Sequence, residues 1–98
     1  MEKQDVIAAL AALAHETRLD VFRLLVQAGP EGLAAGAAAE TLDVPAATLS
    51  FHLKELRNAR LVEARREGRS IRYAPDFANM TALLGYLGEN CCSGGSCD

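Results

Sequence analysis

The 98-residue sequence contains no tryptophan, and aromatic residues make up only 5% of it. Half of its residues are hydrophobic, but many of these are alanines, which have little surface to bury. Length and composition therefore predict one globular domain with a thin core. Dimerisation would be one way for such a short chain to bury more apolar surface.

Long hydrophobic runs are also missing, because no segment approaches the roughly 20 apolar residues of a membrane span. The first residues, MEKQDV, lack the pattern of a secretory signal. We therefore expect a cytoplasmic protein with no membrane partner. Cysteine is confined to Cys91, Cys92 and Cys97 in the last eight residues. In a reducing compartment this odd, clustered set predicts thiols rather than a structural disulfide.

The residue sets that enzymes use are not recognisable in this sequence. It shows no Ser/His/Asp set, no paired carboxylates for acid–base work and no glycine-rich phosphate loop. The three thiols have no evident neighbouring base that would activate one of them as a nucleophile. We expect a protein that is not an enzyme and that has no small-molecule substrate and no enzymatic cofactor.

Charge is distributed unevenly along the chain. Residues 44–74 contain seven basic and three acidic side chains, whereas residues 1–43 contain three basic and seven acidic ones. A basic block within a protein of net charge −3 is typical of a nucleic-acid-binding surface. A solvated charged surface would give the same count, so charge alone leaves both interpretations open.

Hydrophobic periodicity and turn signals predict the order helix, helix, helix, helix, hairpin, helix. Asp5 can cap the first helix, and His15 stands at the start of the second, whose apolar stripe begins at Leu19. The expected fold class is mainly α with one β-hairpin, a winged helix-turn-helix. The predicted segments are residues 5–13, 15–28, 34–42, 45–59, a hairpin of 62–66 and 70–74, and 77–87.

The fourth predicted helix has two different faces. Leu49, Leu53 and Leu56 fall on one stripe at about 100° per residue, with His52 beside it as a hydrogen-bonded packing residue. An exposed phenylalanine has a use in a major groove, where its ring can pack on a thymine methyl group. The alternative is a rotated helix whose phenylalanine packs on the domain. The candidate DNA-reading side chains are Thr48, Ser50, Phe51, Lys54 and Arg57.

The predicted hairpin carries arginines close to its turn. Arg66 and Arg69 flank Glu67 and Gly68, so a wing of this kind presents two cations near its tip. Such side chains can reach the minor groove or adjacent phosphates. We therefore expect Arg66 and Arg69 to belong to the DNA-binding set, with double-stranded operator DNA as the partner.

The segment TLSFHLKELRNARLVEARREGRSIRY, with ALAHETRLDVFRLL upstream, resembles the ArsR/SmtB family of metal-responsive repressors over roughly residues 5–88. The resemblance implies a homodimer, with helical dimerisation elements at both ends of the domain. Two residues depart from the family pattern. Arg60 stands where glycine is usual at the helix exit, and Phe51 stands where a polar or basic residue is common.

The cysteines form the only cluster of soft ligands in the sequence, and we assign them to a flexible effector tail, residues 91–98, after a DNA-binding and dimerisation domain, residues 1–90. Three thiolates without a fourth ligand suit a trigonal pyramidal ion such as As(III) or Sb(III), whereas structural zinc usually takes four. Cys91, Cys92 and Cys97 are therefore the expected metal ligands. The Ser93–Ser96 stretch is short and flexible enough to fold Cys97 back on the pair.

These features predict a homodimeric repressor that leaves its operator when As(III) or Sb(III) binds, derepressing a metalloid-resistance operon. Several alternatives stay open. Cd(II), Hg(II), Bi(III) or Cu(I) could be the effector, or the adjacent thiols could act as a redox switch. A metal-buffering protein that uses its winged helix for protein contacts, or a disordered tail with incidental thiols, would also fit the cysteine pattern.

Overall fold

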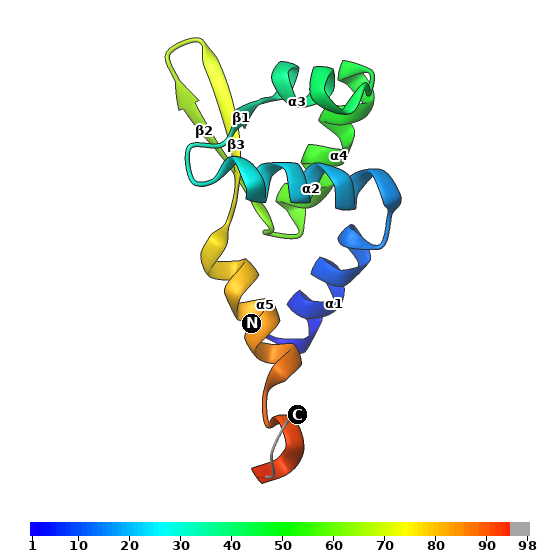
Figure 1. The fold of residues 1–98 in the computed structure, drawn as a ribbon, viewed down its shortest axis with the longest axis vertical. Coiled ribbons are helices and arrows are strands. Elements are labelled where there is room, and N and C mark those ends of the chain that lie inside the picture. Colours follow the sequence, from blue (N-terminus) through cyan, green and yellow to red (C-terminus); the bar gives the residue numbers. More distant parts are fainter. Residues whose placement is uncertain (95–98) are drawn as a thin grey trace.

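The computed structural model describes residues 1–94, and within them it confirms the predicted winged helix-turn-helix. It has five α-helices and a small antiparallel sheet, whose hairpin projects from one side of the helices (Figure 1). The elements of this range are α1 (Lys3–Leu13), α2 (Glu16–Ala28), β1 (Leu33–Ala34), α3 (Ala35–Leu42), α4 (Ala46–Asn58), β2 (Val62–Glu67), β3 (Ser70–Pro75), α5 (Phe77–Gly88) and the 3-10 helix η1 (Cys91–Gly94).

The molecule is elongated, with extents of 50 × 25 × 25 Å and a Cα radius of gyration of 14.9 Å. A compact domain of this length has a radius of about 13 Å. Figure 1 shows the reason, because α2, α3, α4 and the sheet form a body at one end, from which α1 and α5 extend together toward the other end. We call α1 and α5 the stalk.

Local sequence signals determine where the first two helices begin. Glu2 rather than Asp5 is the N-cap of α1, and Asp5 completes a capping box by accepting the backbone N–H of Glu2 at 3.0 Å. The prediction that Asp5 is the cap itself was therefore wrong by three positions. His15 caps α2 as expected, since its Nδ1 accepts the backbone N–H groups of Thr17 and Arg18.

The turn between α3 and α4 is short and depends on two residues. Asp43 adopts a left-handed conformation with φ 53° and ends α3, as the sequence predicts for an aspartate at this place. Pro45, with its ring-restricted φ of −56°, directly precedes α4. These two residues set the helix-turn-helix and bring α4 across the body against α2 and α3.

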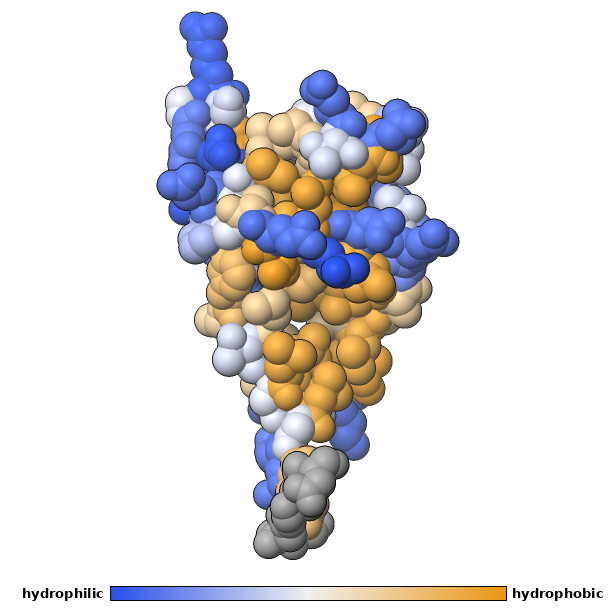
Figure 2. All heavy atoms as spheres, in the orientation of Figure 1, coloured by the Kyte–Doolittle hydropathy of each residue, from blue (hydrophilic) through white to orange (hydrophobic). Residues whose placement is uncertain are grey.

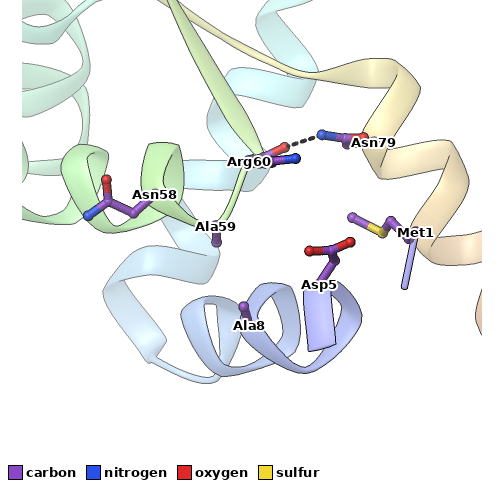
Figure 3. A pocket seen from close by; sticks show the side chains of 7 residues that line it. All are labelled: Met1, Asp5, Ala8, Asn58, Ala59, Arg60 and Asn79. Carbon is purple, nitrogen blue, oxygen red and sulfur yellow. Dashed lines mark hydrogen bonds between the residues drawn. The ribbon is translucent and has the colours of Figure 1, made fainter. Parts of the chain in front are cut away.

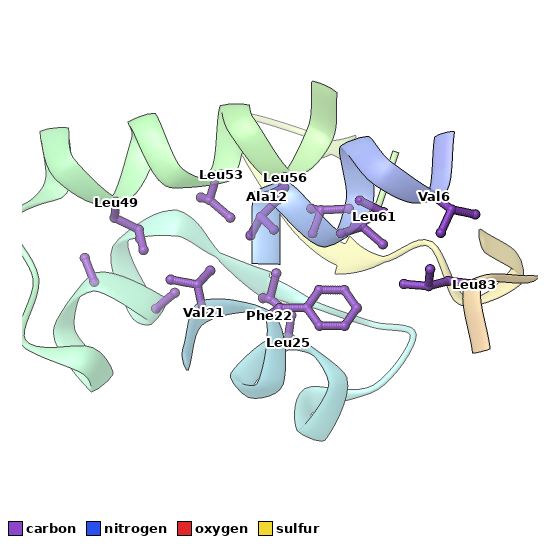
Figure 4. Close-up of a cluster of buried hydrophobic side chains, with 14 residues drawn as sticks. Val6, Ala12, Val21, Phe22, Leu25, Leu49, Leu53, Leu56, Leu61 and Leu83 are labelled. Carbon is purple, nitrogen blue, oxygen red and sulfur yellow. The ribbon is translucent and has the colours of Figure 1, made fainter. Parts of the chain in front are cut away.

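The core lies between α2 and α4. Leu49, Leu53 and Leu56 project from α4 toward α2, as Figure 4 shows, and all three are at most 1% exposed. Burying side chains of this size contributes about 1.5–3 kcal/mol each, so this stripe fixes the rotation of α4. On α2, Phe22 and Leu25 of the expected stripe are buried, as is Val21, which the stripe left out, whereas Leu19 is 45% exposed, contrary to the stripe.

The sheet has a third strand that the sequence did not predict. β1 pairs antiparallel with β3 in the register Leu33 opposite Tyr73, so the order is β1-β3-β2. Gly32 makes this pairing possible because it has φ +71° and lies so close to β3 that a Cβ would be 2.3 Å from the Tyr73 carbonyl oxygen. The wing is thereby attached to the body at its base.

Candidate nucleic-acid interface

The rotation of α4 leaves a polar face on the outside of the body. The sequence-predicted set of Thr48, Ser50, Phe51, Lys54 and Arg57 is exposed along this face, with Phe51 51% exposed. The alternative of a rotated helix with a buried Phe51 is therefore excluded. Contact between these side chains and DNA stays a prediction.

His52 occupies the boundary between the buried and exposed faces of α4. It is 5% exposed, and its Nδ1 accepts a hydrogen bond from Nε of Arg18 at 3.2 Å. Burial lowers the pKa of His52 below 6.5, and the nearby His15 and Arg18 lower it further, against an opposing effect of Glu55. The predicted packing role of this histidine is confirmed.

Two further contacts join the same residues to the exposed phenylalanine. The guanidinium carbon of Arg18 lies 5.6 Å from the centroid of the Phe51 ring, within the range of a cation–π interaction. The Phe51 and His52 rings meet edge to face with centroids 5.7 Å apart. Sequence reasoning missed Arg18, because no periodicity relates a residue of α2 to one 33 positions further along.

The arginines of the wing separate into two pairs. Arg65 donates to the carbonyl of Pro30, and Arg72 donates at 2.9 Å to the carbonyls of both Glu31 and Gly32. These two arginines, which face each other across the hairpin, hold the loop before β1 against the wing. Arg66 and Arg69, the two that the sequence assigned to DNA, are exposed near the tip.

Helix α4 and the wing meet in a shallow concave surface. Lys54, Arg57 and Asn58 of α4 line one side, and residues 62–64 of β2 line the other. Lys54 and Arg57 thus place two cations on this surface, with Glu63 of β2 as an opposing charge. Cations at this place suit contact with the phosphates of a nucleic acid.

The exit of α4 contains the predicted departure at Arg60. This residue adopts φ 62°, a left-handed conformation that glycine would adopt with less strain, and Leu61 continues by donating to the Leu56 carbonyl. The Arg60 carbonyl accepts from Nδ2 of Asn79 at 2.9 Å, as Figure 3 shows. This bond joins the end of α4 to α5, and beside it Asp5 and Asn58 line a small pocket.

The end of α5 leads to the predicted cysteine site. The helix stops at Gly88, and two residues later the chain enters η1 with Cys91 and Cys92, whose Sγ atoms are 3.4 Å apart. A regular α-helix would direct adjacent side chains about 100° apart, and Asn90 and Cys92 have positive φ instead, 58° and 65°. Cys97 lies outside the described residues.

Among residues 1–94, no three His, Cys, Asp or Glu side chains come together as a metal site. The helices of this part of the chain include none that is both long and apolar enough to cross a membrane.

The stacked α2–α4 core, the outward face of α4 and the attached wing define a winged helix-turn-helix DNA-binding protein. Residues 13–65 match the family described as helix-turn-helix domain. The ArsR-like transcriptional regulator of Rhodococcus sp. RHA1 is 30% identical, with a TM-score of 0.77, covering 86% of this chain and 76% of that one. The chain belongs to the ArsR family of winged-helix transcriptional regulators.

Two other solved structures extend over nearly the whole chain. HlyU from Vibrio cholerae N16961 is 29% identical with a TM-score of 0.72, covering 94% of this chain and 99% of that one. The homodimeric winged helix-turn-helix domain of Mb0332 from Mycobacterium bovis, a possible ArsR-family regulator, is 30% identical with a TM-score of 0.70, covering 97% and 88%. A search of curated proteins gave no match.

Proposed function

We propose that this regulator is a homodimeric, cytoplasmic repressor that binds operator DNA and is released by As(III) or Sb(III) bound to Cys91, Cys92 and Cys97. The proposed binding to operator DNA rests on α4 and the wing. The exposed polar face of α4 and the cations near the wing tip lie on one end of the molecule, within the segment where basic residues outnumber acidic ones. Short hydroxyl side chains can reach base edges there, while the cations contact phosphates.

The dimer is supported by the surface of the stalk. Figure 2 shows hydrophobic residues covering its tapering part, and the exposed set includes Ile7 at 51%, Leu10 at 41%, Leu84 at 62% and Leu87 at 56%. A contiguous apolar surface of this kind marks an interaction site. Mb0332 is homodimeric. A two-fold dimer through the stalk would place two reading helices about one DNA turn, ~34 Å, apart.

The metalloid site is supported by one distance, the 3.4 Å between the Sγ atoms of Cys91 and Cys92. Two sulfur atoms this close could bind one thiophilic ion, and three thiolates without a fourth ligand suit a pyramidal ion with a lone pair. Cys97 would supply the third sulfur.

The position of the cysteines suggests how binding would reach the DNA. Only Glu89 and Asn90 separate them from α5, and α5 reaches the exit of α4 through Asn79 and the Arg60 carbonyl. An ion that orders the tail would shift α5 in the dimer toward a geometry with poorer half-site spacing. A coupling of ~3 kcal/mol would weaken operator affinity about 150-fold.

The test uses a duplex selected from a random library by the reduced wild-type protein. Fluorescence anisotropy would follow its release during titration with arsenite, antimonite, and Cd(II), Hg(II), Bi(III) and Cu(I) salts. We expect release by arsenite from the wild type and none from the triple variant Cys91→Ser, Cys92→Ser, Cys97→Ser. Arsenite release from the triple variant would contradict the proposal. Release by peroxide, with indifference to arsenite, would favour a redox switch at the same sulfur pair.

A further inference from the structure

We propose that Arg18 of α2 is a positioning residue for DNA reading, which holds His52 and Phe51 of α4 through one guanidinium group. The inference rests on the proposed role of α4 as the reading helix and adds a residue from outside the basic segment. Arg18 is half-buried between the two helices and belongs to the acidic first part of the chain. Neither the sequence of α2 nor the acidic charge of residues 1–43 indicates that Arg18 contacts the proposed DNA-reading helix.

The hydrogen bond fixes the protonation state of His52. Nε of Arg18 is always a donor, so Nδ1 of His52 must be an unprotonated acceptor and the proton of the neutral ring must be on Nε2. The ring of His15 lies 4.8 Å from that of His52, and its own Nδ1 is occupied as the cap of α2. The neutral state of His52 is therefore part of how α2 and α4 fit together.

The same guanidinium acts on the exposed ring. Because Arg18 lies over Phe51 while bonded to His52, it limits the orientations of a side chain that is half exposed. A fixed aromatic side chain loses less conformational entropy on meeting a thymine methyl group than a free one. Arg18 thus prepares Phe51 for the groove without contacting a base itself.

Acid should break this arrangement. Protonating His52 removes the acceptor and adds a positive charge beside Arg18 and next to His15, with Glu55 as the opposing charge. The folded pKa is lowered, so the stabilisation is complete above the ordinary value of 6.5 and is lost as pH falls through the lowered pKa. We expect operator affinity to fall about tenfold as pH falls below 6.5 and through the lowered pKa of His52. A loss of this size corresponds to one hydrogen bond that involves a charged group.

Four variants separate this role from simple folding. His52→Gln keeps an acceptor that does not titrate, so its affinity should change less than about twofold between pH 7.5 and 5.5. Arg18→Met should bind about tenfold more weakly at pH 7.5 and also lose the pH dependence. Arg18→Lys keeps the charge but not the planar donor and should resemble Arg18→Met. His15→Asn keeps the cap but removes a group that lowers the pKa of His52, so it should keep the pH dependence and move it to higher pH.

Nitrogen-15 NMR of the DNA-free protein gives a readout that does not depend on DNA. We expect the Nε2–H form of His52 in the wild type and a mixture of both neutral forms in Arg18→Met. An Nδ1–H form in the wild type, or an Arg18→Met variant with unchanged His52 signals and an unchanged pH profile, would overturn the inference. A wild type that binds no selected duplex would contradict the proposed function instead, and the NMR result would still decide the Arg18–His52 contact.

Discussion

The body and the stalk differ in how much of their apolar surface is buried within one chain. In the body, Leu49, Leu53 and Leu56 are almost wholly buried against α2. In the stalk, Leu83 is the only residue of α5 that is buried, while Leu84 and Leu87 are more than half exposed. The body therefore has a core of its own, whereas the stalk presents apolar surface that a second copy would cover.

Polar contacts show the same contrast. Arg65 and Arg72 hold the loop before β1 against the wing, and Arg18 holds α2 to α4. Between the stalk and the body, the bond from Asn79 to the Arg60 carbonyl is a comparable contact. The proposed DNA-reading surface is thus held by contacts within one chain, whereas the proposed effector response depends on two helices, α1 and α5, whose apolar faces stay partly exposed in one chain.

The largest expected effect is a loss of the core of the body. Leu53→Ala should lower the free energy of unfolding by about 2–5 kcal/mol, because it leaves a cavity at a position that is 1% exposed. Leu19→Ala, at 45% exposed on α2, is the matched control and should cost less than about 1 kcal/mol. Urea unfolding at one fixed protein concentration measures both. Equal losses would contradict the contrast drawn between buried and exposed leucines.

The second prediction tests whether the stalk is completed by a second chain. Leu87→Glu places a carboxylate on the apolar surface of α5 and should raise the dimer dissociation constant by about 100-fold or more. Sedimentation equilibrium would measure this shift toward monomer. Leu19→Glu, the same change at an exposed leucine of the body, should leave the dimer intact. A dimer unaffected by Leu87→Glu would place the interface elsewhere.

The third prediction concerns the attachment of the wing. Gly32→Ala should cost about 1–3 kcal/mol, because it combines a positive φ with a Cβ that would meet the Tyr73 carbonyl oxygen. We expect faster amide hydrogen exchange along β3 and a lower unfolding free energy.

Gly36 in α3 provides the control for this substitution. A Cβ there meets nothing within 4 Å, so Gly36→Ala should be neutral or stabilise the helix by up to about 1 kcal/mol. If Gly32→Ala were as well tolerated as Gly36→Ala, the close approach of this loop to β3 would not be needed for the wing.

Local signals allowed much of the body to be predicted from sequence. The leucine stripe of α4, the cap at His15 and the left-handed Asp43 each depend on residues within about two helical turns of one another. β1 was missed because two residues carry no periodicity and the strand exists only through its pairing with β3. The stripe expected on α2 was right at Phe22 and Leu25 but included the exposed Leu19 and left out the buried Val21, because spacing alone does not show where the edge of a buried face lies.

The candidate site shows the same limit. A helical wheel is enough to predict which side chains of α4 face outward, since the core stripe determines the rest. It cannot show that Arg65 and Arg72 bind backbone carbonyls of residues 30–32, because those partners are 35 or more positions away. The distinction between arginines that hold the fold and those exposed at the wing tip, Arg66 and Arg69, therefore required the structure.

The smallest expected effect lies at the joint between the two ends. Arg60→Gly should stabilise the protein by up to about 1 kcal/mol, because the left-handed φ of 62° costs glycine less than arginine. The bond from Asn79 uses the backbone carbonyl and should survive the substitution. Thermal unfolding would measure the gain, and Arg60→Ala, which keeps the Cβ, should show none. A loss of stability in Arg60→Gly would mean that the Arg60 side chain, which lines the same small pocket as Asp5, contributes more than the strain costs, and that the body and the stalk are joined by a side chain as well as by the backbone.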